Sequence, residues 1–313
     1  MTDVSAQMPQ SAVTKRPLWR RIWEFPLVAL LVALALLVGC VFATGAILEA
    51  VGRETLSPVM QDVAPALVVV TLVYLITKFG ISRLGRNQRD DLPLSVAPAH
   101  LAMGLGLGFV SFSVVVSVAA LAGVYRITGW GTLDGWIETV MSAGGVAGFV
   151  EEVAFRGVIF RWVEEFAGSW AALAISALLF GFAHAANDGA TLFSSVAIAI
   201  EAGVLLGAAY MLTRSLWLAV GIHASWNLTQ GLVFGVNVSG YDVNGFFEAQ
   251  MRGPDWLSGG AFGLEASVIA LVIATSAGLV MLRMAATRGE LVSPMWVKRQ
   301  EPQALEQEFA QQP

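Results

Sequence analysis

Long apolar runs separated by short polar segments are the dominant pattern of this chain. Each of eight such runs comes near the ~20 residues that a helix needs to cross a ~30 Å hydrocarbon core. We number these predicted spans one to eight, and they cover residues 25–51, 62–81, 98–125, 136–162, 169–185, 191–212, 216–237 and 263–286. The pattern therefore predicts an all-α fold, a polytopic bundle of about eight transmembrane helices.

The composition agrees with a location in lipid. Hydrophobic residues make up 56% of the chain and charged residues 13%, whereas an ordinary soluble domain is ~25% charged. The net charge is −5 with no basic patch outside the flanks of the spans, so we expect no nucleic-acid partner. We expect a multi-pass protein of a cell's inner (cytoplasmic) membrane, with the lipid bilayer as its main partner.

The positions of Lys and Arg predict how the bundle is oriented, because cytoplasmic loops carry an excess of both. With the N-terminus inside, all but three of the 18 Lys and Arg residues fall on the cytoplasmic side. The three exceptions are Arg53, Arg126 and Arg252. Both termini are therefore predicted to be cytoplasmic.

Span four carries charged residues in an otherwise apolar run, and such residues cost at least ~2.5 kcal/mol at bilayer depth. Glu152 and Arg156 are four apart and share a helix face, whereas Glu151 is turned by ~100° from Glu152. We expect Glu152 to pair with Arg156 and Glu151 to face a cavity. A buried pair that only fixes helix packing is the alternative, but it leaves Glu151 unexplained. Glu164 and Glu165 are interpreted as solvated.

Two of the three histidines lie in apolar spans. His184 ends span five, with Phe180 four residues before it, and His223 shares a helix face with Asn227 in span seven. A lone histidine in an apolar helix is more often a hydrogen-bonded core residue than a functional one. Two such histidines beside an unpaired glutamate shift that balance towards a site.

Glu151, His184 and His223 can share one site only if they lie at similar depths in the membrane. Counted from the predicted cytoplasmic ends at 1.5 Å per residue, Glu151 lies ~16 Å deep, His184 ~22 Å and His223 ~10 Å. Helix tilt and boundary errors can absorb most of this spread. One shared site is therefore permitted by the sequence.

Two further features have structural interpretations. Gly144 with Gly148, and Gly203 with Gly207, recur at four-residue spacing, which lets membrane helices approach closely. The outer loop over 238–262 contains several aromatic residues. We favour an interfacial aromatic belt for it over a substrate lid.

Three motifs in the second half of the chain together resemble a known family. They are Glu151-Glu152-x-x-x-Arg156, Phe180-x-x-x-His184 and His223-x-x-x-Asn227. Their order and their place on predicted spans resemble the CPBP family, which comprises type II CAAX prenyl proteases and bacteriocin-processing (Abi) intramembrane proteases. The resemblance covers about residues 140 to 235.

The resemblance implies hydrolysis of a peptide bond in a membrane-associated protein or peptide. By this similarity Glu151 and His184 activate the attacking water, and the pair of Glu152 and Arg156 orders the site. A carboxylate in a low-dielectric cavity beside an arginine suits a general base near neutral pH.

The same resemblance assigns His223 and Asn227 to the oxyanion of the tetrahedral intermediate, where each donor can contribute ~3–4 kcal/mol. Whether a metal takes part stays open at this point. Glu151, His184 and His223 could form a zinc site with an open position for water, but they share no short helical ligand motif. The family is described as metallo-type and as glutamate-type.

Two other functions compete with the protease. A proton-coupled transporter also uses intramembrane Glu, His and Arg, but the chain shows no internal repeat and only one polar cluster. A non-catalytic membrane scaffold or immunity protein would retain the fold without needing every motif residue. The resulting organisation is a cytoplasmic tail (1–24), N-terminal transmembrane helices (25–135), a CPBP-like catalytic core (136–237), an extracytoplasmic loop (238–262), a last transmembrane helix (263–288) and a cytoplasmic tail (289–313).

Overall fold

The computed structural model describes residues 17–298. Its elements in chain order are α1 (Leu18–Trp23), α2 (Pro26–Val51), η1 (Arg53–Thr55), α3 (Pro58–Phe79), η2 (Ile81–Arg83), α4 (Ala97–Leu121), β1 (Tyr125–Trp130), α5 (Trp136–Thr139), η3 (Val140–Glu151), η4 (Val153–Phe160), α6 (Arg161–Ala167), α7 (Ser169–Ala183), η5 (His184–Ala186), α8 (Leu192–Thr213), α9 (Leu216–Leu228), η6 (Thr229–Val233), β2 (Phe247–Met251), α10 (Asp255–Ser258), η7 (Leu264–Ala266), α11 (Val268–Thr287) and α12 (Met295–Lys298). The N-terminal tail as far as residue 16 and the end of the predicted C-terminal tail lie outside the described residues.

Most of the predicted spans are long helices. Among residues 17–298, six helices are long and apolar enough to cross a membrane, namely α2, α3 with η2, α4, α7 with η5, α8 and α11. Predicted spans four and seven are also helical, because α5, η3, η4 and α6 form one continuous helix over 136–167, and α9 continues into η6 up to residue 233. The total of eight crossings and the orientation in the membrane stay predictions.

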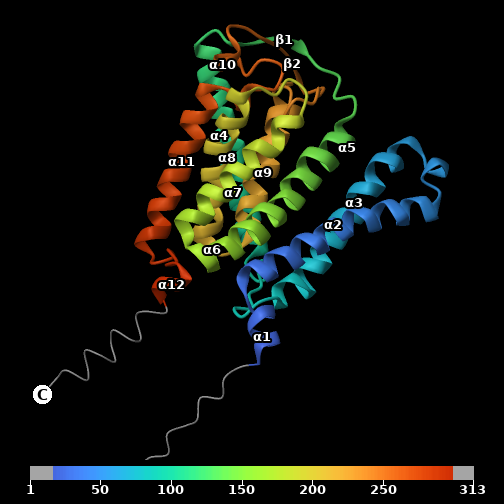
Figure 1. The fold of residues 1–313 in the computed structure, drawn as a ribbon. Coiled ribbons are helices and arrows are strands. Elements are labelled where there is room, and N and C mark those ends of the chain that lie inside the picture. Colours follow the sequence, from blue (N-terminus) through green and yellow to red (C-terminus); the bar gives the residue numbers. More distant parts are fainter. Residues whose placement is uncertain (1–16, 299–313) are drawn as a thin grey trace, which may run out of the picture.

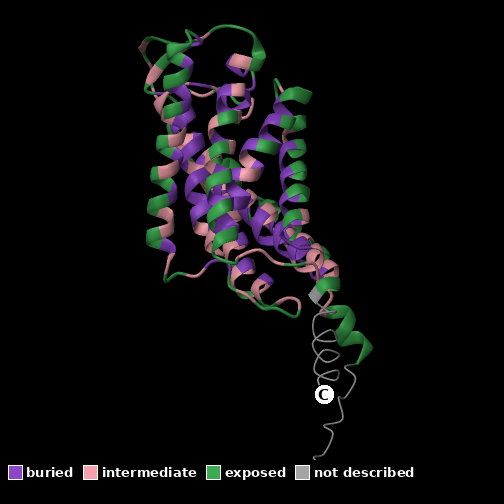
Figure 2. Cartoon of the chain, turned by 90° about the vertical axis from the view of Figure 1, so that its left-hand side faces the viewer, coloured by how far each residue is buried: buried purple, intermediate pink, exposed green. Residues whose placement is uncertain are grey.

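The helices form a bundle around α8 and α9. α8 packs against α7 and α11, and α9 packs against α4 and η3. α2 and α3 form a hairpin that leans away from the rest of the bundle (Figure 1). Buried residues gather in the middle of the bundle, and exposed residues lie along the outward faces of the peripheral helices (Figure 2), as lipid-facing surfaces require.

Glycines at helix contacts explain two of the close approaches. A Cβ on Gly148 would lie 2.8 Å from Cβ of Ala224, so only glycine lets the 136–167 helix approach α9 this closely. A Cβ on Gly207 would lie 2.6 Å from a methyl carbon of Leu173, where α8 meets α7. The predicted packing role of the small-residue pairs is confirmed at both contacts.

The expected all-α fold needs one correction, because the structure contains a small sheet. β1 and β2 pair antiparallel, from Tyr125 opposite Met251 to Trp130 opposite Phe247. The sheet lies at one end of the bundle (Figure 1), and Trp130 stacks on Phe247 with ring centroids 5.3 Å apart. The 238–262 loop therefore contributes a strand as well as connecting segments. Beyond it, the last long helix begins at Val268, later than the predicted residue 263.

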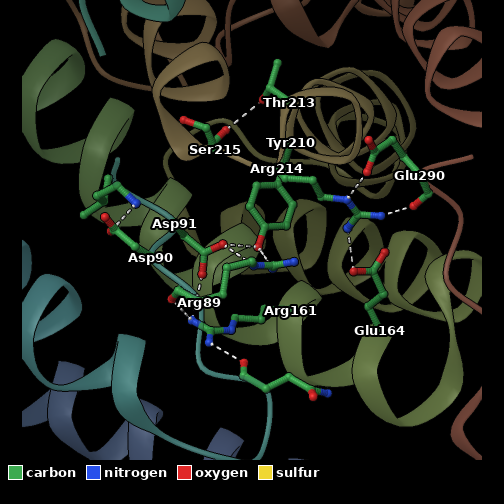
Figure 3. A network of polar contacts seen from close by, with 12 residues as sticks. Arg89, Asp90, Asp91, Arg161, Glu164, Tyr210, Thr213, Arg214, Ser215 and Glu290 are labelled. Carbon is green, nitrogen blue, oxygen red and sulfur yellow. Dashed lines mark hydrogen bonds and ion pairs between the residues drawn. The ribbon is translucent and has the colours of Figure 1, made fainter. Parts of the chain in front are cut away.

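A buried polar network ties down the opposite end of the bundle (Figure 3). Asp91 is 2% exposed. Its carboxylate accepts hydrogen bonds from Arg89 Nε at 2.8 Å, Arg161 Nη1 at 2.8 Å and the Tyr210 hydroxyl at 2.9 Å. The loop before α4 is thus fixed to α6 and α8. Asp91 is paired with two arginines, as a buried carboxylate requires.

Glu164 belongs to the same end of the bundle and corrects a second expectation. It was expected to be solvated, but its side chain is only 4% exposed. Arg214 Nη1 donates to Glu164 Oε2 at 2.6 Å, and the Ser169 hydroxyl donates to Oε1 at 2.6 Å. Arg214 also donates from Nε to Glu290 at 3.1 Å (Figure 3). The carboxylate is buried because two other segments supply its partners.

Candidate active site

The 136–167 helix places the two adjacent glutamates at the centre of the molecule. Its hydrogen bonds follow the wider π pattern over Val140–Glu151 and Val153–Phe160. π-Helical geometry is rare and often occurs at functional sites, although these segments are longer than the usual single turn. Close packing at Gly148 brings the following turn, with Glu151 and Glu152, next to α9.

Glu152 and Arg156 form the expected ion pair. Both side chains are fully buried, and Arg156 Nη1 donates to Glu152 Oε1 at 2.9 Å. Arg156 Nη2 also donates to the carbonyl of Ala202 on α8, at 3.1 Å. The guanidinium lies 4.5 Å from the ring centroid of Phe180, a cation–π distance. The pair therefore joins three helices around one point.

His223 is the second partner of Glu152, a link that the spacing of the motifs did not predict. Its Nδ1 lies 2.8 Å from Glu152 Oε1, the oxygen that also binds Arg156. An Nδ1–H donated to the carboxylate fixes the orientation of the imidazole ring. Nε2 is then directed away from the pair, towards Glu151.

His184 is held in a similar way from the other side. It follows directly after α7, and its Nδ1 lies 2.8 Å from the carbonyl oxygen of Phe180. A carbonyl can only accept, so Nδ1 carries the proton and a neutral ring has its lone pair on Nε2. The four-residue spacing thus lets His184 bond to the backbone carbonyl of Phe180. It also brings the two rings into contact, with their centroids 4.8 Å apart.

Glu151 lies between the two histidines. Its Oε2 is 4.0 Å from Nε2 of His184 and 4.0 Å from Nε2 of His223. These separations are too long for direct hydrogen bonds, and Oε2 is buried without a hydrogen-bond partner among the described residues. A polar contact of this length suits a bridging water. As expected, Glu152 is paired with Arg156, whereas Oε2 of Glu151 is unpaired among the described residues.

Asn227 lies one helical turn after His223, on the same face of α9. Its Nδ2 donates to the carbonyl of Ala143 on the 136–167 helix, at 3.0 Å. An amide NH₂ has two hydrogens, so a second donor remains after this bond is made.

A cavity of about 770 Å³ connects these groups to the end of the bundle that carries the sheet. Glu151, His184, His223 and Asn227 all line it. Its outer wall comes from α5, from the first turns of η3 and from residues 238–244 of the loop. His100 is not among the lining residues. The loop therefore forms part of the cavity wall, which the aromatic-belt interpretation did not anticipate.

Sequence reasoning missed two buried carboxyl groups beside this cavity. Glu201 on α8 is 1% exposed and Glu265 on η7 is 3% exposed. Both line a smaller pocket of about 40 Å³ that also contacts His184, His223 and Asn227. Glu201 lies inside predicted span six, so the signal that singled out Glu151, an acid at bilayer depth, applied to it as well. Glu265 is only the third residue of predicted span eight and precedes α11 in the structure, so depth did not single it out.

Glu265 holds the loop wall in place. Its Oε1 accepts from the Ser239 backbone N–H at 2.6 Å and from the Ser239 hydroxyl at 2.9 Å. Asn187, three residues after His184, donates its side-chain amide to the Ser239 carbonyl at 2.9 Å. Burial raises the pKa of Glu265 to about 7, while the two bonds from Ser239 act in the opposite direction.

Glu151, His184 and His223 are the candidate ligands for a metal ion. Two imidazoles and a carboxylate are chemically suited to zinc, and each Nδ1 bonds to an acceptor as a metal-bound histidine usually does. Two ligands on a tetrahedral zinc at ~2.1 Å lie only ~3.4 Å apart, whereas both histidines lie 4.0 Å from Glu151. No His, Cys, Asp and Glu cluster within residues 17–298 has metal-ligand spacing. As spaced, the residues do not fit a tightly bound ion.

Comparison with known proteins agrees with the motifs. Residues 134–229 match the family model described as type II CAAX prenyl endopeptidase Rce1-like. The resemblance to the CPBP family of intramembrane proteases is confirmed. The matched range contains all seven motif residues that carry the resemblance, Glu151, Glu152, Arg156, Phe180, His184, His223 and Asn227.

The Rce1-like match, together with the apolar helices, supports an integral membrane protein, and the matched family implies a protease. Searches of curated proteins and of solved structures found no match to the chain. The match leaves residues 1–133 and 230–313 uncovered, and these include the loop wall of the cavity and Glu265.

Proposed function

We propose that this protein is an intramembrane endopeptidase that hydrolyses a peptide bond in a membrane-associated protein or peptide. The observation that carries the proposal is the position of Glu151 Oε2, which has no hydrogen-bond partner within residues 17–298 and lies 4.0 Å from Nε2 of both His184 and His223. These three groups line a cavity large enough for a peptide segment.

The first step is activation of water. A water between Glu151 and His184 donates one hydrogen bond to each base, since Nδ1 of His184 carries the ring proton and leaves Nε2 as an acceptor. Glu151 takes a proton as the water oxygen attacks the scissile carbonyl carbon. General-base catalysis of this kind contributes ~10²–10⁴-fold to the rate.

The second step is stabilisation of the tetrahedral intermediate. His223 lies against the carboxylate of Glu152, so an imidazolium there can donate Nε2–H towards the cavity. The second N–H of Asn227 is the other donor, with the first held by Ala143. Donors fixed in advance around the developing oxyanion need no reorganisation during the reaction.

The intermediate then collapses. The C–N bond breaks, the new carboxyl group keeps the oxygen that came from water, and the protonated Glu151 returns its proton to the leaving amine. Glu151 is then ready for a second cycle. Glu152 and Arg156 act as positioning residues, because neither lines the cavity. Glu152 binds Nδ1 of His223, and Arg156 binds the same oxygen of Glu152.

Cleavage of a mixed panel of prenylated and unmodified peptides by detergent-purified protein tests this proposal. We expect Glu151→Gln and His184→Ala to lose cleavage. Glu248→Gln and His100→Ala are matched controls, because neither residue lines the cavity, and both should retain it. Cleavage that survives in Glu151→Gln would refute the proposed mechanism. Loss of activity in all four variants would point to damage to the fold instead.

A further inference from the structure

The mouth of the cavity carries carboxyl groups. Asp134, Glu138 and Asp242 line it at the sheet end of the bundle, and all three are exposed. They come from three places, the turn before α5, α5 itself and the loop after η6. Glu151 lies further along the same cavity. Four carboxyl groups and no Lys or Arg of the described residues therefore line this cavity.

The acidic groups at the mouth are not neutralised by their neighbours. Asp134 accepts a hydrogen bond from the Thr132 hydroxyl at 2.7 Å, and Asp242 accepts one from the amide of Asn237 at 2.8 Å. Both donors are uncharged. Within residues 17–298 no Lys or Arg pairs with any of the three carboxylates. The negative charge of the mouth therefore remains available to a ligand.

The arginines on and beside the sheet do not line the cavity. Arg252 donates from Nε and Nη2 to the side-chain oxygen of Gln250, at 3.0 and 2.7 Å. Arg126 is exposed on β1 and, like Arg252, is not part of the cavity wall. Low-dielectric walls around charges of one sign concentrate their field and raise the local concentration of oppositely charged ligands.

A second observation shows that the same cavity has a place for a ligand atom at its inner end. Glu151 Oε2 is buried, has no hydrogen-bond partner in the described part of the chain and faces the Nε2 atoms of both histidines. A cavity of about 770 Å³ lies in the range that accommodates a ligand of several hundred daltons. The cavity thus joins a polar reaction centre to an acidic entrance.

We propose that the substrate is a cationic peptide segment, with Lys or Arg near the scissile bond. Its basic side chains lie against Asp134, Glu138 and Asp242 while the peptide bond reaches Glu151. This inference rests on the proposed function, since it names the substrate class of the same cavity. The three carboxylates determine specificity and take no part in the chemistry.

Two fluorescent peptides that differ only in having Lys or Gln beside the central bond provide the test. We expect the parent protein to cleave the Lys peptide with a lower KM, and added salt should reduce this preference because it screens exposed charges. In the triple variant Asp134→Asn, Glu138→Gln, Asp242→Asn, the KM for the Lys peptide should rise about tenfold with kcat unchanged. The KM for the Gln peptide should not change.

Asp255→Asn with Glu248→Gln is the matched control, because both residues lie at the same end of the bundle outside the cavity. It should leave both KM values unchanged. Equal KM values for the two peptides in the parent protein, or an equal rise for both peptides in the triple variant, would overturn the inference.

Binding to Glu151→Gln separates this inference from the proposed function. Fluorescence anisotropy of the same peptides with this variant measures recognition without chemistry. A Lys preference in binding, in a protein whose parent cleaves neither peptide, would retain the cationic ligand and refute the protease. Cleavage by the parent without any Lys preference would retain the protease and refute the cationic substrate.

Discussion

His223 on α9 and Glu152 on the 136–167 helix share a bond of 2.8 Å between Nδ1 and Oε1, and the same oxygen binds Arg156 at 2.9 Å. One buried carboxylate therefore sets the position of a cavity-lining histidine and neutralises a fully buried arginine. Breaking such a buried pair by removing one partner costs ~3–5 kcal/mol, because a charge is left unpaired.

The ion pair leads to a prediction about stability. Glu152→Gln and Arg156→Gln should each lower the unfolding temperature in detergent, because each leaves one buried charge without its partner. The double variant should lose less unfolding temperature than the two single losses added together. Thermal unfolding followed by tryptophan fluorescence measures all four proteins. Strictly additive losses would mean that the two residues do not stabilise each other.

The contact at Gly148 predicts a steric effect on the site. Gly148→Ala places a methyl group 2.8 Å from Cβ of Ala224, and overpacking of this kind costs ~1–3 kcal/mol. Because α9 must move, His223 shifts away from Glu152 and cleavage falls. Gly145→Ala is the matched control, since its added Cβ would meet only the Val140 carbonyl at 3.7 Å. Unfolding temperature and kcat, measured together, should fall for the first variant only.

Glu265 predicts a dependence of stability on pH. Its pKa of about 7 lies above the ordinary value of 4.5, so the folded state binds a proton more tightly than the unfolded state. The stabilisation of the folded state by this proton is complete below about pH 4.5 and is lost as the pH rises through about 7. Burial is the largest cause of the raised pKa of Glu265, whereas the charge of His223 lowers this pKa and the charge of Glu151 raises it.

The unfolding temperature of the parent and of Glu265→Gln between pH 4.5 and 8 measures this effect. The parent should lose more stability across that window than the variant does. Glu138→Gln, an exposed acid on the cavity rim, should follow the parent curve. A Glu265→Gln curve parallel to that of the parent would show that Glu265 does not titrate in this range.

The orientation in the membrane can be tested with cysteines. The only native cysteine is Cys40, so Cys40→Ala gives a background without thiols. In intact cells a membrane-impermeant maleimide should label Tyr241→Cys, which is exposed at the sheet end. It should label Arg288→Cys, beyond α11 at the other end, only after the cells are opened. The reverse pattern would invert the predicted topology.

The sequence predicted the parts of the structure that depend on local pattern. Apolar runs located the long helices, and four-residue spacing placed Glu152 with Arg156 on one helix face, where the ion pair forms. The depth estimate allowed a spread of ~12 Å among Glu151, His184 and His223, yet the two histidines lie at equal distances of 4.0 Å from Glu151.

The parts that were missed depend on contacts between distant segments. β1 pairs with β2 about 120 residues later. Its short alternation, Tyr125-Arg126-Ile127-Thr128, directly follows the apolar run of predicted span three, and nothing within the segment identifies its partner strand. Glu164 was expected in solvent because its partners, Ser169 and Arg214, come from other helices. Spacing within one segment carries no information about such partners.

The most direct test of the account compares single-turnover cleavage by the parent protein and by Glu151→Gln, each with and without a chelator. We predict that the chelator leaves the parent rate unchanged and that Glu151→Gln lowers it by ~10²–10⁴-fold. A parent rate abolished by the chelator and restored by zinc would contradict a water activated by Glu151 and His184 alone. A Glu151→Gln rate equal to that of the parent would remove Glu151 from the mechanism.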